Sequence, residues 1–205
     1  MDQPAAKPRN AIAQHAASLI VLRDGPGEPH VLMGLRGAGH RFMPNRLVFP
    51  GGRVDPADHS APCANPLPAP ARALLQKAAR PGLAQALAIA AARELEEETG
   101  LTLGNPPDLG GMDYLCRAVT PPEMPIRFNA RFLVVPADRV SGTLGGSGEL
   151  EGLRWYGLNE TLALDLVWIT QQILLELRRY LALPPDARAA RTRTPLFRRP
   201  GRRLE

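Results

Sequence analysis

The segment at residues 83–99, LAQALAIAAARELEEET, constrains the fold more than any other part of the chain. Ala, Leu, Gln and Glu dominate it, and these residues have high helix propensities. Pro81 and Gly82 precede the segment and Gly100 follows it, a common arrangement at the two ends of a helix. Four apolar residues recur at helical spacing: Leu83, Leu87, Ala91 and Leu95. We therefore expect a long helix with an apolar stripe packed against the rest of the domain.

Apolar runs on both sides of this helix predict the strands of a sheet. Six runs have the composition typical of strands: residues 16–23, 30–36, 46–49, 112–121, 127–136 and 150–156. The turn-rich DGPGEP between the first two predicts a hairpin. Residues 166–183 are amphipathic with helical periodicity and end at Pro184. Two substantial helices among several strands predict an α/β architecture with a mixed sheet.

The chain is long enough for one sizeable domain with short extensions. We expect a flexible arm at residues 1–15, a single domain at residues 16–183 and an Arg-rich disordered tail at residues 184–205. The tail holds seven arginines and two acids, which accounts for the whole net charge of +5. Such tails are mostly solvated, and we do not expect nucleic acid as the ligand.

Cysteine usage and hydropathy favour a cytoplasmic protein. Cys63 and Cys116 are too few for a disulfide framework and form no metal-type pair. The first residues lack the apolar core of a signal peptide, and no run is long enough to cross a membrane. We expect a cytoplasmic location without a membrane partner, and the sequence leaves a homodimer open.

The last turns of the expected helix carry a cluster of carboxylates. At about 100° per residue, Glu94, Glu97 and Glu98 share one face, while Glu96 points away. Acids at a helix C-terminus are disfavoured by about 0.3–1 kcal/mol each. A divalent cation would offset this penalty, because Mg²⁺ prefers oxygen ligands and is often held by a few carboxylates and substrate phosphates. A solvated helix face is the alternative.

A second segment, VFPGGRVDPADHSA at residues 48–61, has a glycine pair that lets the backbone approach a ligand or metal closely. Together the two segments resemble the signature of Nudix hydrolases, Gly-x5-Glu-x7-Arg-Glu-U-x-Glu-Glu-x-Gly-U, in which U is aliphatic. Seven residues match its second half: Arg93, Glu94, Leu95, Glu97, Glu98, Gly100 and Leu101. In its first half Gly52 takes the opening glycine, but Asp58 stands in place of the glutamate.

The resemblance implies a large insertion between the two halves. Asp58 and Arg93 are separated by 34 residues where the signature has seven, an excess of 27 residues, and we place the insertion at about 59–82. Extending a loop costs only about 0.6 kcal/mol for each doubling of its length. The site survives if the insertion bulges outward and tertiary packing, rather than chain continuity, holds the helix against the glycine loop. The superfamily's α/β/α sandwich with a mixed sheet is the implied fold.

The resemblance also implies a metal-dependent hydrolysis. Gly52, through its carbonyl, and the carboxylates of Glu94, Glu97 and Glu98 would hold Mg²⁺ or Mn²⁺. The metal neutralises phosphate oxygens and lowers the pKa of water for attack on phosphorus. Arg93 would orient Glu97 by a charge-assisted hydrogen bond.

The general base has two candidates, because family members differ in this role. Glu98 is the first, and Glu149 is the second because it follows the flexible SGTLGGSG and could swing over the metal site. A plain loop glutamate is the alternative for Glu149, and Glu151 has the same ambiguity.

Residues 32–52 are similar to the segment that precedes this signature in coenzyme A diphosphatases. The residues in register are Leu32, Arg36, Arg41, Phe49, Pro50, Gly51 and Gly52. Arg36 and Arg41 are expected to contact substrate phosphates, because guanidinium presents a planar fork to phosphate oxygens. Gly51 is expected beside them, and Arg127 is a weaker candidate. Surface ion pairs are the alternative for the two upstream arginines.

The substrate implied by this resemblance is a nucleoside diphosphate derivative. Coenzyme A or an acyl-coenzyme A comes first, and ADP-ribose, NADH and dinucleoside polyphosphates are alternatives. A non-catalytic ligand sensor, or a nucleic-acid-associated protein that uses the Arg-rich tail, is the alternative from a different class.

Overall fold

A computed structural model of the chain describes residues 11–39, 42–199 and 201–205. Residues 1–10 of the expected N-terminal arm lie outside these ranges, as do His40 and Arg41. The first strand begins at Gln14, inside the bounds expected for the arm.

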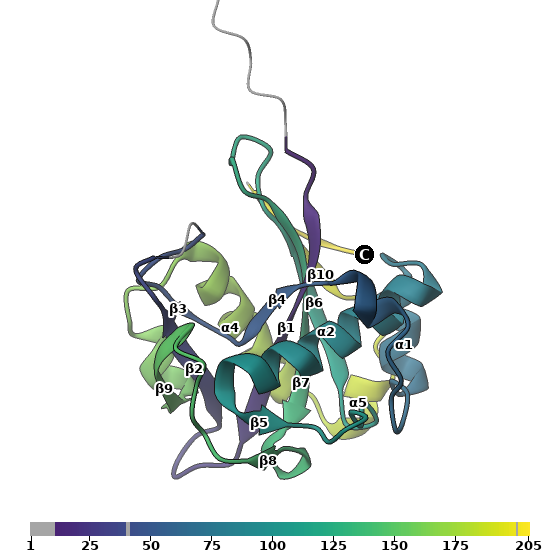
Figure 1. The fold of residues 1–205 in the computed structure, drawn as a ribbon, viewed down its shortest axis with the longest axis horizontal. Helices are drawn as coiled ribbons and strands as arrows, with labels where there is room; N and C mark the ends of the chain where they lie inside the picture. The colour runs from purple at the N-terminus through teal and green to yellow at the C-terminus, as the bar shows by residue number, and fades with distance from the viewer. Residues whose placement is uncertain (1–10, 40–41, 200) are drawn as a thin grey trace, which may run out of the picture.

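A mixed sheet forms the centre of the described structure (Figure 1). Its strands run in the order β11-β10-β6-β7-β1-β2-β3, with β4 paired to β1 and β9 paired to β2. The strands of this sheet are β1 (Gln14–Arg23), β2 (His30–Arg36), β3 (Leu47–Val48), β4 (Gly51–Arg53), β6 (Asp113–Val119), β7 (Phe128–Pro136), β9 (Leu150–Gly157), β10 (Pro195–Arg198) and β11 (Gly201–Leu204). β1 lies parallel to β7, and β10 lies parallel to β6, whereas the other pairs are antiparallel. The predicted mixed sheet is confirmed.

Helices cover both faces of this sheet. The helices are α1 (Ala69–Gln76), α2 (Pro81–Thr99), α3 (Leu158–Leu162), α4 (Trp168–Leu181) and α5 (Pro185–Ala189). Two short 3-10 helices, η1 (Pro56–His59) and η2 (Ala137–Arg139), and a small pair of strands, β5 (Leu101–Thr102) and β8 (Ser141–Gly142), complete the elements. Figure 1 shows α2 in front of the sheet and α4 behind it.

The strand at the centre of the sheet builds a separate core on each face, because successive side chains of a strand point to opposite sides. Leu19 and Val21 of β1 pack in the core under α2, and Ile20 packs in the core under α4. This alternation gives the two-core α/β/α arrangement expected from the resemblance.

The predicted long helix is α2. Its first turn begins at Pro81, and Gly100 ends it in the left-handed conformation with φ 73°. Leu87, Ala91 and Leu95 of the predicted stripe are fully buried. The helix therefore lies across the sheet with its last turns facing β4, which positions the carboxylates described below.

The expected outward insertion at residues 59–82 packs against the domain instead. Leu74 and Leu75 of α1 are buried in the core under α2, and α1 contacts β6. The apolar residues of this segment make it a second layer beside α2, so the expectation of an outward bulge was wrong.

The prediction of a disordered tail at residues 184–205 was also wrong. This segment forms α5 and the β10–β11 hairpin, and β10 extends the sheet alongside β6. The physical reason is that two of its arginines have carboxylate partners in the body of the protein and that Phe197 is buried: Arg191 binds Asp113 at 2.8 Å, and Arg202 binds Glu176 at 3.1 Å. A net charge counted along the sequence did not reveal this pairing.

Within the part of the chain that the structure describes, no helix has the length and apolar composition needed to span a bilayer.

Candidate active site

The C-terminal turns of α2 meet the backbone of β4 at Glu98. The Gly51 amide donates a hydrogen bond to Glu98 Oε2 at 2.7 Å, and the side chain is 1% exposed. Burial raises the pKa of Glu98 to about 8, an effect that the Gly51 hydrogen bond opposes and the charge of Glu94 increases. Glu98 Oε1 is buried and has no hydrogen-bond partner among the described residues. The ability of this oxygen to accept a hydrogen bond or to bind a cation is therefore unused among the described residues.

Gly52 brings the backbone of β4 against a second carboxylate. A Cβ atom at this position would lie 2.3 Å from Glu94 Oε1, so any side chain would displace that carboxylate. Burial raises the pKa of Glu94, and Arg93 opposes this effect. The glycine predicted from the signature is required here by the close approach.

Arg93 connects the acidic helix to the loop that follows β4. Its Nη1 donates to Glu94 Oε1 at 2.9 Å and to Glu97 Oε2 at 3.0 Å. Its Nε and Nη2 donate to the two carboxylate oxygens of Asp58, each at 3.1 Å, and Nη2 also donates to the Arg53 carbonyl at 2.9 Å. Burial alone would lower the pKa of Arg93, but its hydrogen bonds to Asp58 and Glu94 raise it. The expected Arg93–Glu97 contact is present.

Asp58 is therefore the structural link between the two segments. It is 2% exposed, and its Oδ2 also accepts a hydrogen bond from the Asp55 amide at 2.7 Å. The aspartate that departs from the signature thus binds Arg93 in a bidentate manner. Tertiary contacts, rather than sequence proximity, hold the loop against the helix.

The site suits a divalent cation such as those that Nudix hydrolases use. Glu94, Glu98 and the backbone of Gly52 would supply hard oxygen ligands, and the buried Glu98 Oε1 has no hydrogen-bond partner among the described residues. Glu97 is more exposed, at 56%, and its carboxylate is turned toward Arg93. Among the described residues, no three acidic, histidine or cysteine side chains form a complete metal cage. Water and substrate phosphates would complete the coordination, as is common for Mg²⁺.

A cavity of about 870 Å³ opens beside these carboxylates. It lies where the sheet divides, because β1 pairs with β2 at Leu22 and Arg23 but with β4 from Ala16 to Ser18. The lining near α2 includes Arg36, Gly51, Gly52, Glu94, Glu97 and Glu149. Its volume is in the range of pockets for small molecules and cofactors.

The comparison with known proteins agrees with this geometry. Residues 80–177 match the NUDIX domain. This range contains α2 with all its carboxylates and Glu149, whereas the β4 glycines and Asp58 precede it. The match and the hydrolase neighbours below support a hydrolase that acts on phosphoric anhydrides.

Solved structures of NUDIX proteins share the fold. A NUDIX hydrolase from Alicyclobacillus acidocaldarius is 26% identical with a TM-score of 0.62, and the alignment covers 80% of this chain and 90% of that one. A MutT NUDIX hydrolase from Burkholderia pseudomallei is 19% identical, with a TM-score of 0.53 and coverage of 82% and 99%. The NUDIX domain of Shewanella oneidensis NrtR complexed with ADP ribose is 15% identical, with a TM-score of 0.55 and coverage of 88% and 94%. The last two show the fold alone. No curated protein sequence matches the chain.

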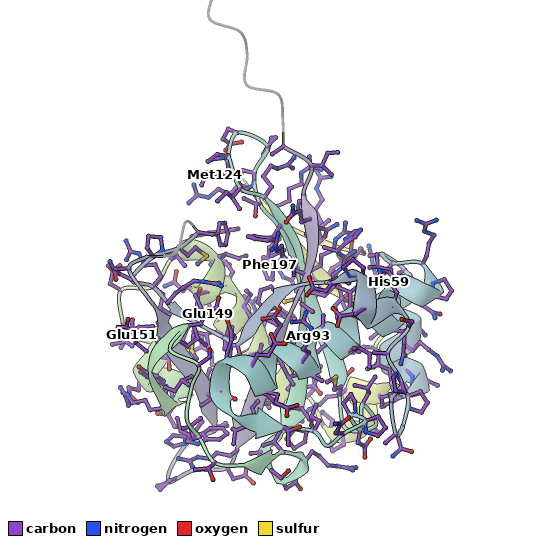
Figure 2. All side chains as sticks on the ribbon, in the orientation of Figure 1. His59, Arg93, Met124, Glu149, Glu151 and Phe197 are labelled. Carbon is purple, nitrogen blue, oxygen red and sulfur yellow. The ribbon has the colours of Figure 1, made fainter. Side chains whose placement is uncertain are left out.

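Two further residues predicted for the site form an ion pair on the cavity wall. Arg36 Nη2 lies 3.0 Å from Glu149 Oε1, and their side chains are 19% and 40% exposed. Both line the cavity. Figure 2 shows Glu149 and Arg93 near the middle of the viewed face, whereas Glu151 lies at its edge. The structure thus brings Glu149 to the cavity and leaves Glu151 exposed, at the edge of the view.

The other two arginines predicted to contact phosphate, Arg127 and Arg41, are not placed at the cavity by the structure. The Arg127 guanidinium donates to the backbone carbonyls of Thr120 and Ala11 and does not line the cavity. Arg127 therefore stabilises the backbone of neighbouring segments and does not contact the cavity. Arg41 lies outside the described residues.

Sequence reasoning missed the residues that line the far side of the cavity. Trp168, at the start of α4, and Phe197 and Arg199, in the C-terminal hairpin region, all line it. The apolar pair Leu196-Phe197 among the arginines was the signal in the sequence that this segment is ordered, because solvated, disordered segments are poor in large apolar residues.

Proposed function

We propose that the protein is a metal-dependent pyrophosphohydrolase that cleaves the diphosphate linkage of coenzyme A or an acyl-coenzyme A. The observation that carries the proposal is the juxtaposition of Glu94, Glu98 and Gly52, held by the Arg93–Asp58 pair, beside a large cavity. The similarity of residues 32–52 to coenzyme A diphosphatases supports this choice of substrate. We keep a cytoplasmic location and an open question of dimerisation as expectations.

Some residues of the site would bind the metal and the substrate, and others position those residues. Glu94, Glu98 and the Gly52 carbonyl would hold Mg²⁺ or Mn²⁺, which would neutralise phosphate oxygens and lower the pKa of an attacking water. Arg93 fixes the rotamers of Glu94 and Glu97 through hydrogen bonds of 2.9 and 3.0 Å. A substrate placed with its diphosphate beside these carboxylates would meet the guanidinium of Arg36 on the adjacent wall.

We infer the general base from the position of each carboxylate. Glu98 is buried and already accepts the Gly51 amide, which suits a ligand better than a group that exchanges protons with solvent. Glu149 is partly exposed on the cavity wall, where it can reach a water beside a bound diphosphate. We therefore favour Glu149 as base over Glu98, the first candidate from the sequence.

The experiment is a hydrolysis assay with Mg²⁺ and then Mn²⁺ against coenzyme A, acetyl-coenzyme A, ADP-ribose, NADH and diadenosine polyphosphates, with products identified by mass. Release of 3′,5′-ADP and a phosphopantetheine species is the expected result. Cleavage of only the other compounds would show that the substrate is not coenzyme A. If folded, metal-loaded protein hydrolysed none of the compounds, the proposal of a hydrolase would be contradicted.

A pair of variants on α2 tests the site assignment within this assay. Glu97→Gln should abolish most metal-dependent turnover, because Glu97 lines the cavity beside Glu94 and would join Glu94 and Glu98 in holding the metal, as the sequence resemblance implies. Glu96→Gln is the matched control, since Glu96 accepts a hydrogen bond from Thr102 on the other side of the helix. Equal activity of the two variants would refute the assignment.

The sensor and nucleic-acid alternatives remain distinguishable by experiment. Two arginines of the tail, Arg191 and Arg202, bind carboxylates of the body, and Arg193 donates to the Leu204 carbonyl. A nucleic-acid ligand would have to compete with these contacts. Salt-sensitive binding of RNA or DNA by a protein without hydrolase activity would favour this alternative.

A further inference from the structure

A second cavity, of about 370 Å³, lies beside the loop that follows β4. Its walls come from the start of β1, the end of β4, η1 and the first turn of α2. The residues that matter below are Gln14, His15, Arg53, Asp55 and His59. We name this cavity the basic pocket, and the larger one beside the α2 carboxylates the main cavity. Glu94, Glu97 and Glu98 do not line the basic pocket, so hydrolysis of a diphosphate leaves it without a role.

The basic pocket lies next to the main cavity. Arg53 and Asp55 line both cavities. In the view of Figure 2, His59 of the basic pocket lies to the right of Arg93, whereas Glu149 of the main cavity lies to its left. The two cavities are therefore neighbours that share the end of β4.

Arg53 and His59 bring hydrogen-bond donors to the basic pocket that the fold itself leaves largely unused. The exposed Arg53 guanidinium makes one side-chain hydrogen bond among the described residues, from Nη1 to Gln14 Oε1 at 3.5 Å. The His59 imidazole is exposed and makes no hydrogen bond to any described residue. Both side chains are thus available to a ligand without the loss of a strong internal contact.

His15 is held as a hydrogen-bond donor by a buried arginine. Arg131 is fully buried, and its Nη1 lies 3.0 Å from His15 Nδ1. A guanidinium can only donate, so Nδ1 accepts and the proton of the neutral ring lies on Nε2. The Arg131 guanidinium is fixed in turn by the carbonyls of Asn129 and Ala78, at 2.7 and 2.8 Å. His15 therefore has its Nε2–H left to offer a ligand in the basic pocket.

The charges around the basic pocket are mainly positive. The pKa of His15 is lowered by burial first, and then by four basic side chains: Arg131, Arg117, His59 and Arg80. Burial, followed by the charge of Arg117, also lowers the pKa of Arg131 to about 10, and the buried Arg131 Nε has no partner among the described residues. Asp55 is the acid that lines the pocket, and it lies 3.9 Å from Arg93. An anion in the pocket would offset this excess of positive charge.

The chemistry of these groups fits a phosphate. A guanidinium presents a planar fork to phosphate oxygens, and imidazole and amide N–H groups donate to the remaining oxygens. Hydrogen bonds to a charged oxygen are the stronger kind. A metal cation would be repelled by Arg53 and the arginines behind His15, and an apolar ligand would leave the donors unpaired.

We propose that the basic pocket binds a phosphate group outside the site of diphosphate cleavage, with Arg53, His15 and His59 as its donors. Free inorganic phosphate and a phosphate monoester of a nucleotide in the main cavity share this chemistry. The shared wall of Arg53 and Asp55 makes the second source accessible from the main cavity. The proposal does not depend on hydrolysis by the α2 carboxylates.

The first test is a titration of the metal-free protein with inorganic phosphate in EDTA at neutral pH, followed by NMR of the histidine ring protons. Signals of His15 and His59 should shift together with one saturable dissociation constant. His30 is the internal control, because its Nδ1 pairs with the Glu28 carbonyl and it lines neither cavity. Potassium chloride at matched ionic strength should shift none of the three. Absence of a saturable shift with phosphate and with the nucleotide 3′,5′-ADP would overturn the proposal.

A pair of arginine variants separates a specific site from general charge. Arg53→Gln should weaken phosphate binding at least about tenfold, because it removes a charged donor. Arg72→Gln is the matched control, since Arg72 is an exposed arginine of α1 that lines neither cavity. It should change the affinity by less than about twofold. Equal losses in the two variants would contradict a site at the basic pocket.

Calorimetry in EDTA with 5′-AMP and 3′,5′-ADP identifies the source of the phosphate. The two nucleotides differ by one phosphate monoester. If the pocket takes a phosphate of the nucleotide, 3′,5′-ADP should bind at least about tenfold more tightly, and Arg53→Gln should remove the difference. If it takes free phosphate, the nucleotides should bind equally and inorganic phosphate should still bind in the presence of 5′-AMP. Turnover is not part of these measurements, so a protein that hydrolyses no diphosphate can still confirm the pocket, and a hydrolase that binds no phosphate here refutes it alone.

Discussion

Replacing Asp58 by asparagine tests whether one buried ion pair holds the two halves of the site together. Asp58 is 2% exposed and accepts two hydrogen bonds of 3.1 Å from Arg93. The substitution removes the charge and turns an amide NH₂ toward one of the guanidinium donors. Arg93 then keeps Glu94, Glu97 and the Arg53 carbonyl as its partners. The positive charge remains, but the opposite charge at position 58 and one of the two hydrogen bonds to it are lost.

The expected cost follows from this geometry. Breaking a fully buried ion pair by removing one partner costs about 3–5 kcal/mol, and hydrogen bonds to charged groups contribute about 1.5–3 kcal/mol each. The Arg93 side chain is 25% exposed, so water compensates part of the loss. We expect Asp58→Asn to lower the free energy of unfolding by about 3 kcal/mol, the lower end of this range.

The assay is equilibrium unfolding in urea, in EDTA so that metal binding does not contribute. Asp55→Asn is the control in the same loop, because Asp55 is 56% exposed and lies 3.9 Å from Arg93. It should change the free energy of unfolding by less than about 0.5 kcal/mol. If Asp58→Asn behaves like this control, the pair does not hold the loop to the helix and the reasoning is refuted.

Three further predictions concern the glycine, the buried carboxylate and the tail. Gly52→Ala should weaken Mn²⁺ binding by at least about tenfold in calorimetry, because its Cβ would lie 2.3 Å from Glu94 Oε1; unchanged affinity would remove Glu94 from the metal site. The folded-state pKa of Glu98 is raised from 4.5 to about 8, so the metal-free folded state binds the extra proton and its stability falls as pH rises through this window. At about 1.4 kcal/mol per tenfold change the full effect is at most about 5 kcal/mol. Glu98→Gln should flatten this dependence in unfolding curves measured in EDTA between about pH 5 and about pH 9, and an unchanged slope would contradict it. Phe197→Ala should lower the free energy of unfolding by about 3–5 kcal/mol, since the side chain is 1% exposed; a loss below about 1 kcal/mol would show that the tail is not part of the core.

The features that depend on local sequence were predicted correctly. The helix from Pro81 to Thr99 follows from its composition, and Gly100 ends it in the left-handed conformation that the sequence predicts. The order of the carboxylates on α2 follows from helical geometry, which is why Arg93 reaches Glu97 as expected. These contacts are four residues apart or fewer, so the chain itself fixes them.

The features that depend on distant contacts were not accessible in the same way. Asp58 meets Arg93 across 35 positions, and only the folded structure shows that the shorter acid still reaches the guanidinium. The tail was predicted to be disordered from its net charge alone. In the structure, Arg202 binds Glu176 on α4 and Arg191 binds Asp113 on β6. These ion pairs and the pairing of β10 with β6 order the basic segment, which then lines part of the cavity. No local sequence pattern predicts which residues it contacts.

Hydrolysis of coenzyme A in ¹⁸O-labelled water, with Mn²⁺ present, tests the central claim most directly. The account predicts metal-dependent cleavage of the diphosphate with one labelled oxygen on a phosphorus of one product for each turnover, and loss of this signal when Glu98 is replaced by glutamine. Folded wild-type protein that binds Mn²⁺ but incorporates no label into coenzyme A or into any other diphosphate of the panel would contradict it.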